Sequence, residues 1–227
     1  MPRQLAMSAA ARYSKRMKER YDDLDEYIGD LRAEAAKAPD CASVHYNLGI
    51  ALLGRRDFAG AEEAFLCALR KAPRLAEAYV QLGGLCMQRG DLEGCLNYNR
   101  EAAACRPRFA LAWGNIGFVH MQRGEAEEAV PALKKALKWD PRFVQAWATL
   151  GSACFALGRL EESIAASERA LALQPGFAPA YNNLAVAWLE KGEGAKAAAY
   201  AEQAAKHGFE VAEGLWKELA PYRANSK

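Results

Sequence analysis

The sequence predicts an all-α protein, built as a solenoid of stacked antiparallel helix pairs. Three observations predict this fold. Similar segments recur 34 residues apart, as in RPRFALAWGNIGFV at 106–119 and DPRFVQAWATLGSA at 140–153. Apolar residues within each segment are spaced by three and four, as one face of a helix requires. The composition is 52% hydrophobic, much of it alanine, and favours soluble helices. Because one helix pair cannot bury its apolar face alone, consecutive copies must stack.

An N-terminal amphipathic helix is expected before the repeats, within residues 1–38. Over residues 8–38 the apolar stripe is Tyr13, Met17, Tyr21, Leu24, Ile28, Leu31 and Ala35. The first part of this segment is basic and the next part is acidic. We expect it to cap the exposed face of the first repeat. Alternatively, its near-heptad stripe docks onto another helix, including one from a second copy of the chain.

Five copies of the repeat follow, expected at 42–75, 76–109, 110–143, 144–177 and 178–211. Prolines end the second helix of each pair, and a large residue follows each proline by six positions. Glycines between the two helices of a pair indicate a left-handed C-cap. The prolines are Pro39, Pro73, Pro107, Pro141 and Pro175; the large residues are His45, Tyr79, Trp113, Trp147 and Tyr181; the turn glycines are Gly90, Gly124, Gly158 and Gly192.

Residues 212–227 are expected to form a C-terminal capping helix and a tail. Val211, Leu215 and Leu219 lie four residues apart and would cover the last repeat. Truncation at Gly208 is therefore expected to expose that repeat.

The columns of the repeat resemble the tetratricopeptide-repeat family. The family pattern W-x2-L-G-x2-Y…A-x3-F…P is matched by Trp113, Ile116, Gly117, Ala129, Leu133 and Pro141. Copy two departs from it at Cys95 and Asn99, and copy five at Ala185 and Phe209. The resemblance implies a right-handed superhelix whose inner surface holds a segment of a partner protein. It also implies that the second, fifth, sixth, ninth, twelfth and thirteenth positions of each repeat face inward.

These inner positions give the candidate binding residues. Amide and hydroxyl side chains at the sixth position can donate to and accept from a peptide backbone. They serve equally well as polar contacts between helices. Apolar residues at the ninth and twelfth positions suit an amphipathic helix or an apolar peptide, unless neighbouring helices bury them. The candidates are Asn47, Ile50, Leu53, Gln81, Met87, Asn115, Phe118, Met121, Thr149, Phe155, Asn182, Asn183, Val186 and Leu189.

A second set of candidates lies at one edge of the predicted solenoid. Arg74, Arg108 and Arg142 follow the prolines and would form a row. This row is either solvated or a contact for an acidic partner.

The sequence predicts a non-enzymatic adaptor that binds a peptide or amphipathic helix of a partner protein. The alternative is a structural protein that self-assembles through residues 8–38. No phosphate-binding, zinc-protease or serine-nucleophile motif occurs, so we expect no catalytic residue, cofactor or metal. His120 is expected to be a core histidine with a partner. The formal charge of +2 argues against nucleic-acid binding.

The cellular context follows from the ends and the cysteines. The N-terminus becomes basic before a secretory-type apolar core develops, and no apolar run could span a bilayer. The six cysteines form no CxxC pair and are expected to be buried small hydrophobes rather than disulfides. A cytoplasmic location is expected, and the alanine- and arginine-rich composition is compatible with a bacterial origin.

Overall fold

The computed structural model describes residues 24–223, and these residues form twelve helices and no strand. The all-α prediction is confirmed over this range. The chain divides into two compact units, and the boundary between Leu85 and Cys86 falls within helix α5 (Ala76–Gln88). Each unit is therefore described by itself.

The first unit contains a helix pair and one helix before it. These helices are α2 (Leu24–Lys37), α3 (Ala42–Gly54) and α4 (Phe58–Lys71). α3 packs on α4, and α2 packs on α3. α2 buries Tyr27, Ile28 and Leu31, and its Asp25 forms an ion pair of 2.7 Å with Arg55 at the end of α3.

The predicted N-terminal helix is thus observed from Leu24 to Lys37. This part covers α3, as a cap would. The predicted stripe residues Tyr13, Met17 and Tyr21 lie outside the described residues.

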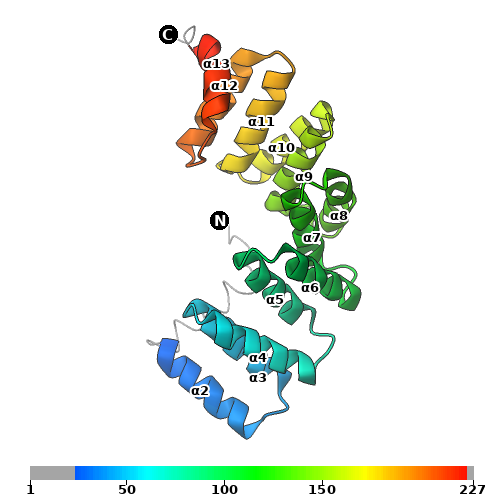
Figure 1. Cartoon of the computed structure of the whole chain (residues 1–227), viewed down its shortest axis with the longest axis vertical. Helices are drawn as coiled ribbons and strands as arrows, with labels where there is room; N and C mark the ends of the chain where they lie inside the picture. Colours follow the sequence, from blue (N-terminus) through cyan, green and yellow to red (C-terminus); the bar gives the residue numbers. More distant parts are fainter. Residues whose placement is uncertain (1–23, 224–227) are drawn as a thin grey trace, which may run out of the picture. The chain divides into compact units, whose positions relative to one another are not determined.

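The second unit contains three successive helix pairs, which Figure 1 shows one after another. Within each pair, a short turn joins two antiparallel helices, and the second helix also packs on the first helix of the next pair. α6 precedes the pairs and packs on α7, and α13 follows them. The helices are α6 (Leu92–Cys105), α7 (Ala110–Gln122), α8 (Ala126–Trp139), α9 (Val144–Ala156), α10 (Leu160–Leu173), α11 (Ala178–Glu190), α12 (Gly194–Lys206) and α13 (Glu213–Arg223).

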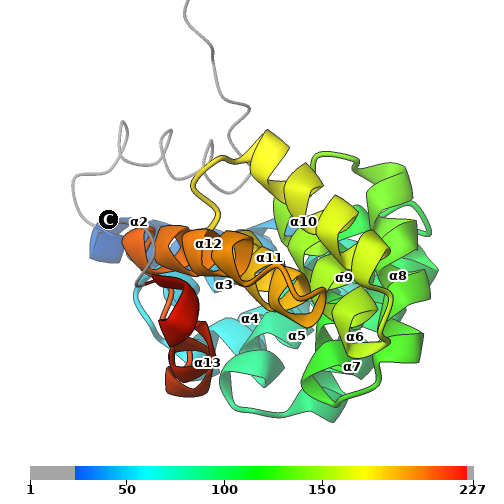
Figure 2. The same ribbon diagram turned by 90° about the horizontal axis from the view of Figure 1, so that it is seen from above.

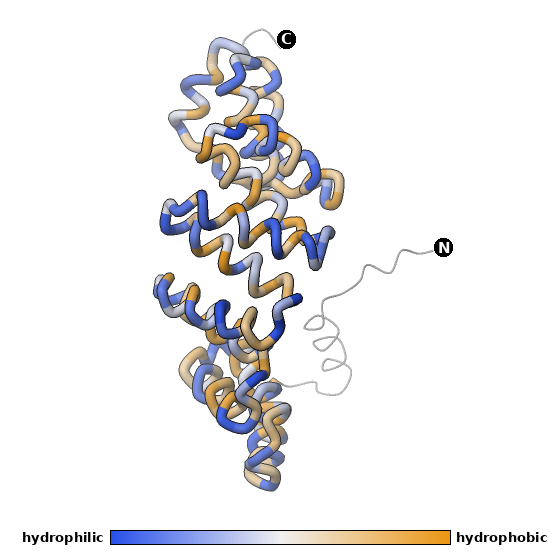
Figure 3. The backbone as a smooth tube through the Cα atoms, turned by 90° about the vertical axis from the view of Figure 1, so that its right-hand side faces the viewer, coloured by the Kyte–Doolittle hydropathy of each residue, from blue (hydrophilic) through white to orange (hydrophobic). Residues whose placement is uncertain are grey.

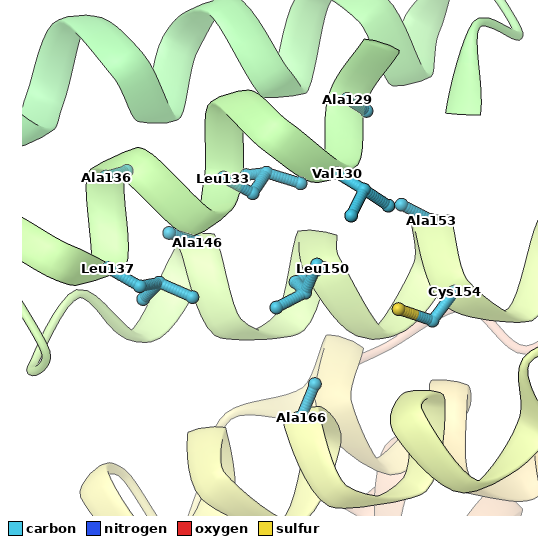
Figure 4. Close-up of a cluster of buried hydrophobic side chains, with 10 residues drawn as sticks. All are labelled: Ala129, Val130, Leu133, Ala136, Leu137, Ala146, Leu150, Ala153, Cys154 and Ala166. Atoms are coloured by element: carbon cyan, nitrogen blue, oxygen red, sulfur yellow. The ribbon is translucent and has the colours of Figure 1, made fainter. Parts of the chain in front are cut away.

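Apolar side chains fill the space between these pairs. Polar and apolar residues alternate along each helix (Figure 3), as an amphipathic helix requires. Leu133 and Val130 of α8 meet Leu150 and Ala153 of α9 in one buried cluster, and Ala166 of α10 approaches from the other side (Figure 4). Small residues dominate the core, so the helix axes can approach closely.

The turns inside the pairs use the left-handed conformation that the glycines predicted. Gly90, Gly124, Gly158 and Gly192 have φ between 69° and 79°. In the first pair, Arg56 takes this conformation, with φ of 65°. The sequence offers no glycine there, and the fold imposes the same turn on an arginine.

The pairing of a proline with a large residue six positions later has a direct physical cause. Trp113 Nε1 donates a hydrogen bond of 2.9 Å to the carbonyl oxygen of Pro107. Trp147 and Tyr181 donate in the same way to Pro141 and Pro175, and His45 bonds to Pro39. Each bond joins the first helix of a pair to the loop that precedes it, and so holds that loop in place.

The last helix covers the end of the second unit. α13 packs on α12 and runs at a steep angle to it (Figure 2). Leu219 and Val211 are buried in a cluster with alanines of α12, and Leu215 packs against this cluster. The ring of Tyr222 lies over Gly194, where an added Cβ would come within 2.4 Å of it.

Candidate functional site

A pocket of about 590 Å³ lies in the second unit, between the first helices of three successive pairs. This volume is within the range of about 300–1,000 Å³ that is usual for ligand sites. α7 packs on α9, and α9 packs on α11, so the three helices form a continuous wall. The lining residues are Leu111, Gly114, Asn115, Phe118, Met121, Gln122, Phe143, Gln145, Ala146, Ala148, Thr149, Ser152, Phe177, Pro179 and Asn183.

The lining of the pocket follows the inner positions that the resemblance implied. From α7, the lining residues are those at the second, fifth, sixth, ninth, twelfth and thirteenth positions of the repeat. α9 contributes its second, third, fifth, sixth and ninth positions, and α11 its second and sixth. The first helices of the three pairs therefore turn the same face toward one cavity.

Five predicted binding residues line this pocket together. They are Asn115, Phe118, Met121, Thr149 and Asn183. Phe118 is 41% exposed, as is Leu111 one helical turn away from Asn115. None of the fifteen lining residues carries a charge, so the pocket has an apolar wall with amide and hydroxyl groups.

Two aromatic walls of the pocket were not predicted. Phe143 and Phe177 are the N-cap residues of α9 and α11, and neither makes a side-chain capping bond. Phe143 lies against α7, where a Cβ added to Gly114 would come within 2.4 Å of its ring. Phe109, Phe143 and Phe177 stand 34 residues apart. This repeated phenylalanine could have indicated the aromatic walls from the sequence alone. It lies just before each first helix, however, and the predicted inner positions were all within those helices.

Four polar side chains of the pocket, those of Asn115, Thr149, Ser152 and Asn183, are already bonded within the protein. Asn115 Nδ2 donates to Oδ1 of Asn99 at 2.9 Å, and Thr149 Oγ1 donates to the carbonyl oxygen of Gln145 at 2.8 Å. Asn99 is fully buried and donates to the carbonyl oxygen of Cys95. The departure of copy two from the family pattern at Asn99 thus holds the amide of Asn115 in place.

Asn183 uses both ends of its amide in the wall. Its Nδ2 donates to the carbonyl oxygen of Ala148 at 2.8 Å, and its Oδ1 accepts from Ser152 Oγ at 3.1 Å. The side chain is buried. It ties α11 to α9, which is the inter-helix role that the sequence left open for this column.

The other predicted binding residues lie outside the pocket. Asn47, Ile50 and Leu53 are half-buried on α3, and Gln81 and Met87 are half-buried on α5. Phe155 packs against the cluster around Ile164 and Leu184, and Leu189 packs against the cluster under α13. Asn182 and Val186 are half-buried on α11.

The three edge arginines Arg74, Arg108 and Arg142 are exposed. The guanidinium of Arg108 lies 5.0 Å from the centre of the Trp139 ring, and the backbone N–H of Arg142 donates to Asp140 Oδ1 at 2.9 Å. Arg108 and Arg142 each lie within three residues of a residue that lines the pocket.

The predicted core histidine has its partner. His120 is 8% exposed, and its Nδ1 lies 2.6 Å from Glu125 Oε2. Arg123 joins Glu125 and Glu93 at 2.8 Å each. The hydrogen bond from His120, with help from Arg123, lowers the pKa of Glu125. Within residues 24–223, no group of side chains is arranged to hold a metal ion.

The prediction of buried cysteines is confirmed for Cys86, Cys95 and Cys154 and is wrong for Cys41, Cys67 and Cys105, which are partly exposed. Across the described helices, none is both long and apolar enough to cross a bilayer.

The family profile described as "Tetratricopeptide repeat" matches residues 28–75, 46–109 and 115–177. These matches cover more than half of the sequence. The chain belongs to the tetratricopeptide-repeat family. The profile matches several times between residues 28 and 177, so the resemblance seen in the repeat columns is confirmed.

Solved tetratricopeptide-repeat structures share the fold. The crystal structure of the MamA protein is 23% identical, covers 80% of this chain and 94% of its own, and gives a TM-score of 0.64. YrrB, described as a TPR protein with an unusual peptide-binding site, is 18% identical over 85% of this chain and 97% of its own, with a TM-score of 0.68. PilW, described as a type IV pilus biogenesis factor, is 21% identical over 82% of this chain and 87% of its own, with a TM-score of 0.70. A search of curated protein sequences found no match.

Proposed function

We propose that this tetratricopeptide-repeat protein is a non-enzymatic adaptor that holds a short apolar segment of a partner protein. The segment, a peptide or one face of an amphipathic helix, enters the pocket between α7, α9 and α11. The observation that carries the proposal is the pocket itself, because three successive first helices turn their inner positions toward it.

The character of the wall favours an apolar, uncharged anchor. Leu111 and Phe118 are each 41% exposed at the pocket. Fully burying one large apolar side chain stabilises a complex by about 1.5–3 kcal/mol. A charged anchor would lose its hydration at a wall that has no opposite charge to offer. The bonded amides of Asn115 and Asn183 keep the wall in one shape, which reduces the entropy lost on binding.

The family and its structural neighbours support a role in protein recognition. The description of YrrB as having a peptide-binding site agrees with a peptide ligand for this fold. We propose the cytoplasm as the location, since all six cysteines are free thiols, the state that a reducing compartment maintains.

The test is a selection of 12-residue peptides from a displayed random library on the intact chain. The dissociation constants of the recovered peptides are then measured by fluorescence anisotropy. Leu111→Glu and Phe118→Glu place a charge in the pocket at exposed positions, where folding is least affected. Loss of one buried apolar contact of about 1.5–3 kcal/mol corresponds to a roughly 10- to 100-fold weaker complex.

The matched controls are Leu66→Glu on α4 and Tyr222→Glu on α13. Their wild-type side chains are 36% and 40% exposed, similar to Leu111 and Phe118, but neither lines the pocket. All four variants must keep the helicity and melting temperature of the intact chain. Equal dissociation constants for pocket and control variants would mean that peptides bind elsewhere.

A further inference from the structure

A group of exposed cations lies beside the pocket, and we call it the basic edge. It consists of Arg108, Lys135, Lys138 and Arg142, gathered around Trp113 and Trp139. All four cations are exposed, and Trp139 is 39% exposed. The carboxylate of Asp140 lies in the same segment and accepts from the backbone N–H of Arg142. The four cations outnumber it, so in a chain with a net charge of only +2 the basic edge is a local concentration of positive charge.

Three of the four cations of the basic edge contact aromatic rings. Arg108 and Lys138 lie 5.0 and 5.2 Å from the centre of the Trp139 ring. Lys135 lies 4.1 Å from the centre of the Trp113 ring. Such contacts hold the long side chains in place without neutralising them.

Several other cations of the second unit pair with carboxylates, although Lys191 and Lys196 also lie over the ring of Trp188. Arg123 pairs with Glu93 and Glu125. Lys191 pairs with Glu161 at 2.6 Å, and Lys134 pairs with Glu162 at 3.5 Å. All of these pairs except Arg123 with Glu125 link neighbouring repeats. Over the described residues, Arg108, Lys135 and Lys138 have no carboxylate within ion-pair distance, so their charge remains available to a ligand.

The basic edge borders the pocket through the chain itself. Arg142 directly precedes Phe143, and Arg108 lies three residues before Leu111; both Phe143 and Leu111 line the pocket. Arg142 follows Trp139 by three residues, which places their Cα atoms no more than about 11 Å apart. A segment that fills the pocket can therefore reach Arg108 and Arg142 with flanking residues.

We propose that the partner segment carries acidic residues next to its apolar anchor, and that these pair with Arg108 and Arg142. The proposal rests on the proposed function, since the anchor occupies the same pocket. Arginine forks bind carboxylates with defined geometry. The acidic flank therefore sets the direction in which the segment lies, and the positive field increases the rate of encounter.

The test uses three synthetic peptides with the same Leu-Phe-Leu core, flanked on both sides by three glutamates, three glutamines or three lysines. Their affinities for the intact chain are measured by fluorescence anisotropy at low salt and at 0.5 M salt. We expect the glutamate peptide to bind about tenfold tighter than the glutamine peptide at low salt. The difference shrinks at high salt, because salt screens exposed charges.

Two double variants separate recognition of charge from a change in net charge. Arg108→Glu with Arg142→Glu should remove the preference for glutamate flanks. Arg169→Glu with Lys206→Glu makes the same change in net charge at exposed residues outside the basic edge and outside the row of edge arginines. The control pair should keep the preference.

The outcomes distinguish this inference from the proposed function. If all three peptides bind equally and Phe118→Glu weakens them all, the pocket is the site but the acidic flank is wrong. If the glutamate preference depends on the basic edge but Phe118→Glu has no effect, acidic recognition is upheld and the pocket is not the anchor site.

A nucleic acid is the competing ligand for cations beside exposed aromatic rings. A labelled 12-nucleotide oligouridine is measured in the same assay. If it binds tighter than the glutamate peptide, and the Arg108→Glu and Arg142→Glu pair abolishes that binding, the inference is overturned. It is also overturned if none of the three peptides binds.

Discussion

Gly117 and Leu133 lie opposite each other on the two helices of one pair. A Cβ added to Gly117 would lie 2.5 Å from Leu133 Cγ. Gly49 meets Phe65 in the same way at 2.6 Å, sixteen residues further along the chain in each case. In the last copy, Ala185 replaces the glycine and Ala201, also sixteen residues later, is small and buried in the same cluster. Where alanine replaces the glycine, the residue sixteen positions later is thus smaller than Leu133 or Phe65.

We predict that Gly117→Ala lowers the free energy of unfolding by about 1–2 kcal/mol, because overpacking outweighs the gain in helix propensity. In a Leu133→Ala background, the same change should be neutral or stabilising, since the space is then open. Urea unfolding of the four proteins of this double-mutant cycle gives the coupling. Gly29→Ala, where no atom lies within 4 Å of the added Cβ, should stabilise by about 0.5–1 kcal/mol. Equal effects of Gly117→Ala in both backgrounds would contradict the packing account.

The cysteines differ in reactivity for reasons of environment. Burial raises the pKa of Cys95 to about 11 and also raises that of Cys154. A hydrogen bond between Cys41 Sγ and Ser43 Oγ, 3.2 Å apart, lowers the pKa of Cys41. The thiolate is the reactive form.

At pH 7.5 we therefore predict that iodoacetamide modifies Cys41 first and leaves Cys95 and Cys154 intact until the chain unfolds. The rate at Cys41 should rise with pH and level off below the pH expected for an ordinary thiol. Ser43→Ala should slow it, and peptide mass spectrometry gives the site-by-site rates. Modification of Cys95 in the native protein, at a rate like that of Cys41, would contradict the assigned burial.

At the scale of the helices, periodicity determines most of the structure. Prolines at 34-residue intervals predicted where second helices end, and each lies two residues beyond a helix that ends at Lys37, Lys71, Cys105, Trp139 or Leu173. The turn at Arg56 could not be predicted from a glycine, since packing of α3 on α4 imposes the left-handed conformation there. Likewise, Phe143 and Phe177 act as pocket walls through tertiary packing, which a search within helices misses.

We predict that truncation after Gly208 destabilises the last helix pair by about 3–5 kcal/mol, because it removes the buried Val211 and Leu219. In a repeat array this appears as local unfolding at one end. Hydrogen exchange should therefore accelerate in α11 and α12. Lys217→Ala, an exposed change on α13, should leave exchange unchanged. Normal exchange in the truncated chain would exclude a stabilising role for α13.

At the scale of the whole chain, the repeat columns predicted helix pairs but not which inner residues meet in one cavity. Side chains of similar type on α3 and α11, such as Asn47 and Asn182, lie outside the pocket. The difference arises from tertiary contacts: Phe143 over Gly114 and the bonds of Asn183 shape the cavity. The boundary between the two units falls in copy two, the copy that departs from the family pattern at Cys95 and Asn99.

The proposed function requires a partner segment to occupy the pocket between α7, α9 and α11. The most direct measurement is site-specific photo-crosslinking, with benzoylphenylalanine placed at Phe118 or at Tyr222 and a selected peptide as the ligand. Both side chains have similar exposure, 41% and 40%, but only Phe118 lines the pocket. We predict a crosslinked peptide from Phe118 and none from Tyr222. Equal crosslinking from both, or crosslinking from Tyr222 alone, would contradict the assignment of the pocket as the binding site.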